Sequence, residues 1–220
     1  ANNWLQFALS NLIEYDLSQD IFLDVQSALN YITKISNAGF VEGTGTPFQL
    51  KKKIAQEAYK NLFLTGSFSL QNGNYIIDTE LFDSQTGKQI ASHQYSEKDF
   101  MKAVDAISVD FKIDCDIPEK HISETVDLPV GEIYTSSISA LESFTKGYLE
   151  IVFKNNWPEG VKLTEKSLKE DPGFTAAHLA AAQFYFNNNH SEIALPSFQM
   201  ALDNLYKLPY RQQFFTKYLY

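Results

Sequence analysis

Residues at matching positions recur at an interval of 34 in the last third of the chain. Periods of roughly 20–50 residues are typical of proteins built by stacking one repeated helical hairpin or blade. Three residue pairs carry the interval: Gly160/Ala194, Thr164/Phe198 and Ser167/Ala201. Small side chains let two paired helices approach closely, and an aromatic ring fills the space between neighbouring pairs. We therefore expect Phe198 and Ala201 to be buried between helical hairpins.

Residues 136–220 show no strand pattern, so we predict an all-α helical-hairpin domain there.

The first half of the chain has a different period. From Leu62 to Leu70 apolar residues alternate with small or polar ones, as a half-buried strand requires. Asn72-Gly73 is a strong hairpin signal, and Thr86-Gly87 turns the chain again toward a third strand over 89–96. The pattern predicts a three-stranded antiparallel meander.

Helical spacing of apolar residues predicts four helices around this meander, at 4–17, 27–36, from 48 onward and at 98–112. Ile21–Val25 looks like an additional short strand. Together these elements indicate an α+β domain over residues 1–115, with the helices on one side of the sheet. Residues 116–135 have no clear period and contain Pro118, Pro129 and Gly131, so we interpret them as a linker.

The second half resembles the tetratricopeptide repeat family. Leu168–Ala177 is similar to the junction between two such repeats, and Tyr185 stands at the aromatic position of the following helix. The sequence departs from the family at His178, where tryptophan is common, and at Pro196, which lies inside a helix and removes one hydrogen bond. The resemblance is specific for residues 157–203 and implies a superhelical stack with a concave binding groove.

The first half resembles the α/β domain of TolB N-terminal type. The likeness is carried by Phe63–Ser67, Tyr75, Leu81–Lys88 and Asp105–Ser108. The same domain followed by tetratricopeptide hairpins is found in membrane-anchored bacterial regulators of CadC type and in bacterial Ser/Thr kinases with helical-repeat tails. The family's opening strand is absent here, and the abrupt start of the chain suggests a piece of a longer protein.

Charge and motifs narrow the function. The chain has 27 acidic and 18 basic residues, a net charge of −9, which disfavours binding to a phosphate backbone. We expect no catalytic residues, no metal site and no cofactor, because phosphate-loop, Gly-x-Ser-x-Gly and kinase catalytic motifs are missing and no two histidines are close in sequence. A kinase domain, if the full-length protein has one, would lie outside this chain. The single cysteine, Cys115, is expected to be a buried thiol.

The resemblance implies a non-catalytic sensor or scaffold region of a membrane-anchored bacterial signalling protein, favoured outside the cytoplasm and anchored by a segment absent from this chain. Its partner would be a protein or peptide, not a nucleic acid. By repeat geometry the candidate contacts are Leu179, Gln183, Phe186 and Asn187. These residues either line a groove or pack against the first domain. The alternative function is a small-molecule receptor with a pocket between the two domains.

Overall fold

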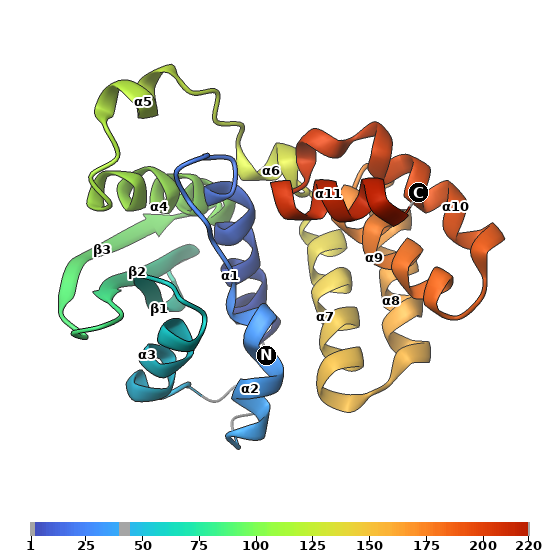
Figure 1. Ribbon diagram of the computed structural model, residues 1–220, viewed down its shortest axis with the longest axis horizontal. Coiled ribbons are helices and arrows are strands. Elements are labelled where there is room, and N and C mark those ends of the chain that lie inside the picture. The colour runs from blue at the N-terminus through green and yellow to red at the C-terminus, as the bar shows by residue number, and fades with distance from the viewer. Residues whose placement is uncertain (1–2, 40–44, 220) are drawn as a thin grey trace. The chain divides into compact units, whose positions relative to one another are not determined.

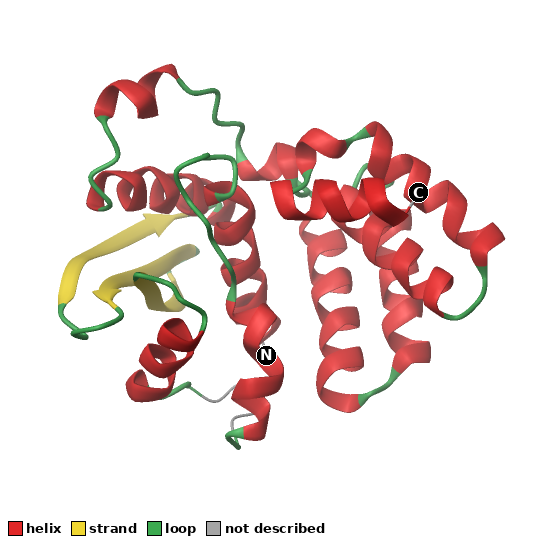
Figure 2. Ribbon diagram, viewed as in Figure 1, coloured by secondary structure: helices red, strands yellow, loops and turns green. Residues whose placement is uncertain are grey.

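The computed structural model describes residues 3–39 and 45–219. Eleven α-helices and one three-stranded antiparallel sheet are present among them, so the protein is a mixed helix-and-sheet structure (Figures 1 and 2). The chain divides into two compact units. One runs from Ala28 to Val126, and the other combines the residues up to Ser27 with those from Asp127 onward. We call them the sheet unit and the helical unit.

The sheet unit contains a meander of β1 (Leu62–Gln71), β2 (Asn74–Asp83) and β3 (Gln89–Glu97), in the spatial order β1-β2-β3. The predicted hairpin is confirmed: Asn72 and Gly73 both have positive φ, 51° and 82°, as a two-residue turn of this kind requires. In the second turn Oδ1 of Asp83 accepts hydrogen bonds from the backbone N–H groups of Gln85 and Thr86. These bonds lower the pKa of the Asp83 carboxyl group, with the bond from Thr86 as the main cause.

Helices pack on both faces of this sheet, not on one side as the sequence suggested. Helix α4 (Phe100–Asp114) covers the face that carries Ile77 and Leu81. Helix α3 (Phe48–Glu57) lies at one end of the opposite face (Figure 1). There Phe48 packs against the rings of Phe63 and Phe82. Phe63 and Phe82 alternate with the residues under α4, so covering these two rings requires a helix on the other side.

Three short helices complete the sheet unit: η1 (Ala28–Tyr31), α2 (Ile32–Asn37) and α5 (Glu119–Glu124). The strand predicted over Ile21–Val25 is wrong. The backbone N–H of Phe22 donates to Oδ1 of Asp20, which forms a turn, and Ile21 and Phe22 are exposed. An apolar run forms a strand only where a neighbouring strand can pair with it. Residues 21–25 belong to the helical unit, whereas the three described strands all belong to the sheet unit.

The helical unit contains two antiparallel hairpins and a final helix. The hairpins are α7 (Ile138–Lys154) with α8 (Trp157–Glu170), and α9 (Thr175–Asn187) with α10 (Ser191–Asp203). A short η2 (Leu205–Lys207) leads to α11 (Tyr210–Leu219). From residue 138 to 219 the structure describes helices and turns without a strand, as predicted. Phe198 and Ala201 are 2% and 0% exposed, which confirms that both are buried.

Close approach of α7 and α8 depends on two facing glycines. A Cβ atom built on Gly160 would lie 2.3 Å from Cγ1 of Ile151 and 2.8 Å from the carbonyl oxygen of Gly147. The hydroxyl of Ser167 donates to the buried carbonyl oxygen of Ala140 at 2.8 Å. The small residues that define the 34-residue interval in α8 therefore lie where two helix backbones nearly touch.

The division of the chain differs from the predicted domains 1–115 and 136–220 with a linker at 116–135. Helix α1 (Asn3–Leu17) packs against α7 and the short α6 (Val130–Ile133), so it belongs to the helical unit. The end of the predicted linker belongs there too. The Tyr134 side chain is 2% exposed and its ring contacts those of Tyr15 and Phe174. An aromatic ring buried in this way makes the segment part of a core.

Candidate partner-binding surface

The four residues predicted as partner contacts all lie on α9 but differ in exposure. Leu179 is 3% exposed and is therefore part of the packed side of the helix. Gln183 is half-buried and Asn187 is exposed. Phe186 is 44% exposed, and its ring packs edge-to-face with that of Phe198, with the ring centroids 6.1 Å apart. Burial removes Leu179 from the accessible surface, so the predicted contact surface is reduced to the C-terminal half of α9.

Exposed apolar side chains are concentrated beyond that point. In the described part of the chain 20 large apolar residues are exposed. Nine of them lie on α9, α10, η2 or α11. They are Phe186, Ile193, Leu195, Met200, Tyr206, Tyr210, Phe214, Phe215 and Tyr218. Single exposed apolar residues are normal on protein surfaces, whereas a concentration of them marks an interaction site. Much of this surface is on α11.

Helix α11 has one anchored face and one uncovered face. On the anchored face Gln212 accepts a 2.7 Å hydrogen bond from the hydroxyl of Tyr15 in α1, and Thr216 is fully buried. On the uncovered face Tyr210, Phe214 and Tyr218 follow one another at every fourth residue and are 69%, 58% and 85% exposed. We call these three residues the aromatic stripe. Residues four apart lie on one side of a helix, so this periodicity was visible in the sequence.

The α7 side of the helical unit is already covered by α1. Phe7 packs on Phe153 with ring centroids 5.7 Å apart, and the Asn11 side chain donates a hydrogen bond to the hydroxyl of Tyr134. Burial raises the pKa of the Tyr15 hydroxyl well above its usual range, although the bond to Gln212 opposes the shift. Helix α1 therefore covers part of α7, whereas the nine exposed apolar residues named above lie from α9 to α11.

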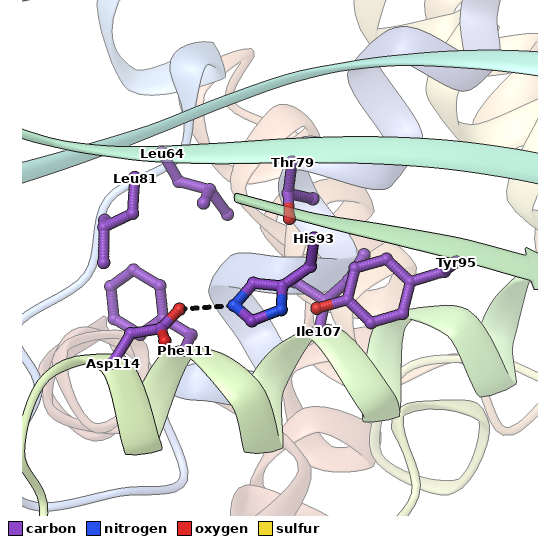
Figure 3. Close-up of a pocket in the computed structure, with 8 residues that line it drawn as sticks. All are labelled: Leu64, Thr79, Leu81, His93, Tyr95, Ile107, Phe111 and Asp114. Atoms are coloured by element: carbon purple, nitrogen blue, oxygen red, sulfur yellow. Dashed lines mark hydrogen bonds and ion pairs between the residues drawn. The ribbon is translucent and has the colours of Figure 1, made fainter. Parts of the chain in front are cut away.

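In the sheet unit, ionisable groups gather where β3 meets the end of α4 (Figure 3). Nε2 of His93 lies 2.8 Å from Oδ2 of Asp114, and its Nδ1 lies 3.9 Å from Oδ2 of Asp110. The hydroxyl of Tyr95 donates to the same Asp110 oxygen at 2.9 Å. Burial, followed by that bond to a carboxylate, raises the pKa of Tyr95. The adjoining cavity is about 10 Å³, which is at the lower limit for one water molecule, so it has no room for a substrate.

The contacts of His93 and Tyr95 with Asp114 and Asp110 join the edge strand β3 to α4, which is a structural role. Among residues 3–39 and 45–219, no group of three His, Cys, Asp or Glu side chains is arranged to hold a metal ion. Cys115 is half-buried and not fully buried as expected. Its partial burial, with Asp114 and Asp116 nearby, raises the pKa of the thiol to about 11. A nucleophilic cysteine needs a lowered pKa, so Cys115 is a poor nucleophile at neutral pH.

The face of the sheet opposite α4, which we call the outer face, carries an open hollow of about 650 Å³. Its side chains come from all three strands and from α3, and include Lys51, Thr65, Ser67, Asp78 and Glu80. The Lys51 ammonium donates to the hydroxyl of Thr65. Small-molecule sites are mostly enclosed and apolar, whereas this hollow is polar and open, as the wet face of an antiparallel sheet normally is.

Comparison with known proteins does not assign the chain to a family: no protein-family model matches it, and no curated protein matches it in sequence. Within the described ranges no helix combines the length and the apolar character that a bilayer crossing demands.

Proposed function

We propose that this chain is a non-catalytic sensor or scaffold region that binds a protein or peptide partner through its helical unit. The observation that carries the proposal is the exposed apolar surface of α9–α11, which contains nine of the 20 exposed large apolar residues. Exposed apolar side chains gathered in one part of a protein are typical of interaction sites.

The repeat pattern supports the same proposal. Stacked helical hairpins present side chains from successive helices to a partner, and the resemblance to tetratricopeptide repeats and to a TolB N-terminal-type domain implies a place in a membrane-anchored bacterial signalling protein. The alternative of a small-molecule receptor with a pocket between the domains stays a prediction. Neither hollow described within the sheet unit has the enclosed apolar lining that such a receptor uses.

A peptide-display selection on the purified chain tests the proposal without knowledge of the partner. We expect enriched peptides to bind the wild-type chain and to lose at least about tenfold in affinity when Phe186→Ser and Phe214→Ser are combined, because aromatic anchors carry most of the energy of an interface. Ile138→Ser is the matched control, since Ile138 is 44% exposed at the start of α7. A selection that enriches no peptide, or peptides unaffected by the two Phe variants, contradicts the proposal.

A further inference from the structure

The end of the helical unit differs in charge from the rest of the chain. Residues 204–220 contain three basic residues and no acidic one, whereas the whole chain has a net charge of −9. The basic residues are Lys207, Arg211 and Lys217, and the last two lie on α11 and are exposed. Positive charge therefore accompanies the aromatic stripe on one short segment of an acidic protein.

The stability of the helix does not account for Arg211. The positive end of the macrodipole is at the start of a helix, so an acidic residue is favoured there and a basic one is disfavoured. Arg211 is the second residue of α11, and the first turn of this helix contains no acidic residue. Within the described ranges neither Arg211 nor Lys217 forms an ion pair. Both cations are thus available to groups outside the chain.

The two cations lie on opposite flanks of the aromatic stripe. Arg211 is one residue after Tyr210 and Lys217 is one residue before Tyr218, so at about 100° per residue they flank the stripe on its two sides. If a fully covered aromatic residue buries roughly 150–250 Å², the exposed fractions of the stripe amount to roughly 400 Å². That is about half of what one partner contributes to a standard interface, and it suits one docked helix in a transient complex.

Charge selects among the possible occupants. A second copy of this chain, paired through α11, would bring two basic segments together, and like charges at an interface oppose association. An anionic membrane surface would attract α11 but repel the remainder of a chain with a net charge of −9. A helix with acidic residues beside its apolar face matches both the stripe and the two cations.

We propose that α11 docks an acidic amphipathic helix of a partner protein. Apolar side chains of that helix pack on the aromatic stripe, and its Asp or Glu residues pair with Arg211 and Lys217. The backbone groups of α11 are used within the helix, so the partner is held by side chains and not by strand addition. This inference rests on the proposed function and names the class of partner.

The test uses two synthetic peptides that share one set of leucines at helical spacing and differ only in flanking residues, Glu in one and Lys in the other. Each carries a fluorophore, and its anisotropy is measured against the full chain. We expect the Glu peptide to bind at least about tenfold more tightly, and Arg211→Glu with Lys217→Glu to reverse that preference, because two exposed ion pairs become two repulsive pairs. Phe214→Ser should weaken the Glu peptide by at least about tenfold, and Ile138→Ser should not.

Three results overturn the inference. One is equal binding of both peptides. The second is binding that the charge reversal leaves unchanged. The third is Phe214-dependent cosedimentation with phosphatidylserine vesicles without any preference between the peptides. If display selection on the same chain still enriches peptides that depend on Phe186 and Phe214 but are basic or extended, the proposed function stands and only the acidic helix is refuted.

Discussion

The contact between α7 and α8 gives a sharp test of the helical packing through Gly160→Ala. Alanine normally stabilises a helix interior by about 1 kcal/mol relative to glycine. At this position the new methyl group would lie 2.3 Å from Cγ1 of Ile151 and 2.8 Å from the carbonyl oxygen of Gly147. Ile151 can change rotamer, but the backbone oxygen moves only if the helices separate. Overpacking costs about 1–3 kcal/mol, and a clash with a backbone atom belongs to the upper part of that range, about 2–3 kcal/mol, which exceeds the gain in helix propensity.

We therefore expect Gly160→Ala to lower the free energy of unfolding by about 1–2 kcal/mol, which corresponds to a fall in Tm of roughly 3–6 °C for a chain of this size. Urea unfolding followed by circular dichroism measures the first quantity, and a thermal scan measures the second.

Gly131→Ala is the matched control, because a Cβ atom there would make an ordinary 3.9 Å contact with Cβ of Ser136. It should be neutral or stabilising. Gly147→Ala should destabilise by a similar amount to Gly160→Ala, and the two together by less than the sum, because one separation of the helices relieves both contacts. A Gly160→Ala variant as stable as the wild-type chain would refute the close packing of α7 on α8.

Two further predictions concern Ala201 and Cys115. Ala201 is fully buried, so Ala201→Lys should unfold the helical unit by burying an unpaired charge, and an unchanged thermal transition would contradict its burial in a packed core. With a pKa of about 11, only roughly one Cys115 thiol in ten thousand is ionised at pH 7. Its reaction with a disulfide reagent should thus be slow at pH 7 and accelerate steadily as the pH rises toward 11. Fast modification at pH 7 that ceases to accelerate above pH 9 would show an ordinary thiol.

Local signals in the sequence predicted local structure well. Asn72-Gly73 fixed the first hairpin because both positions require positive φ, and the alternation on either side gave the strands. The 34-residue interval predicted which residues of α10 would be buried. These features depend on a residue and its near neighbours, and a sequence contains that information directly.

Packing partners were harder to predict. The apolar spacing of α1 indicates an amphipathic helix but not the surface on which it packs. In the structure α1 packs on α7 and belongs to the helical unit. Ile21 and Phe22 are apolar yet exposed, and Tyr134 lies in an apparent linker yet is buried. Each of these positions is decided by contacts with residues far away in the sequence.

Only some of the residues expected to contact a partner are exposed. The expected contacts on α9 include Phe186, which is exposed, and Leu179, which is not. The aromatic stripe of α11 was visible as a periodic pattern, but the same pattern is produced by a helix that buries its aromatic face in a core. Only the exposure of the three rings distinguishes the two cases.

Chemical-shift mapping shows directly whether α9–α11 is the partner-binding surface. Isotope-labelled chain is titrated with a display-selected peptide, and amide and side-chain resonances are followed. We expect the largest changes on Phe186 and along α11, with little change around His93 or on the outer face of the sheet. Changes concentrated in the sheet unit, with α11 unaffected, would contradict it.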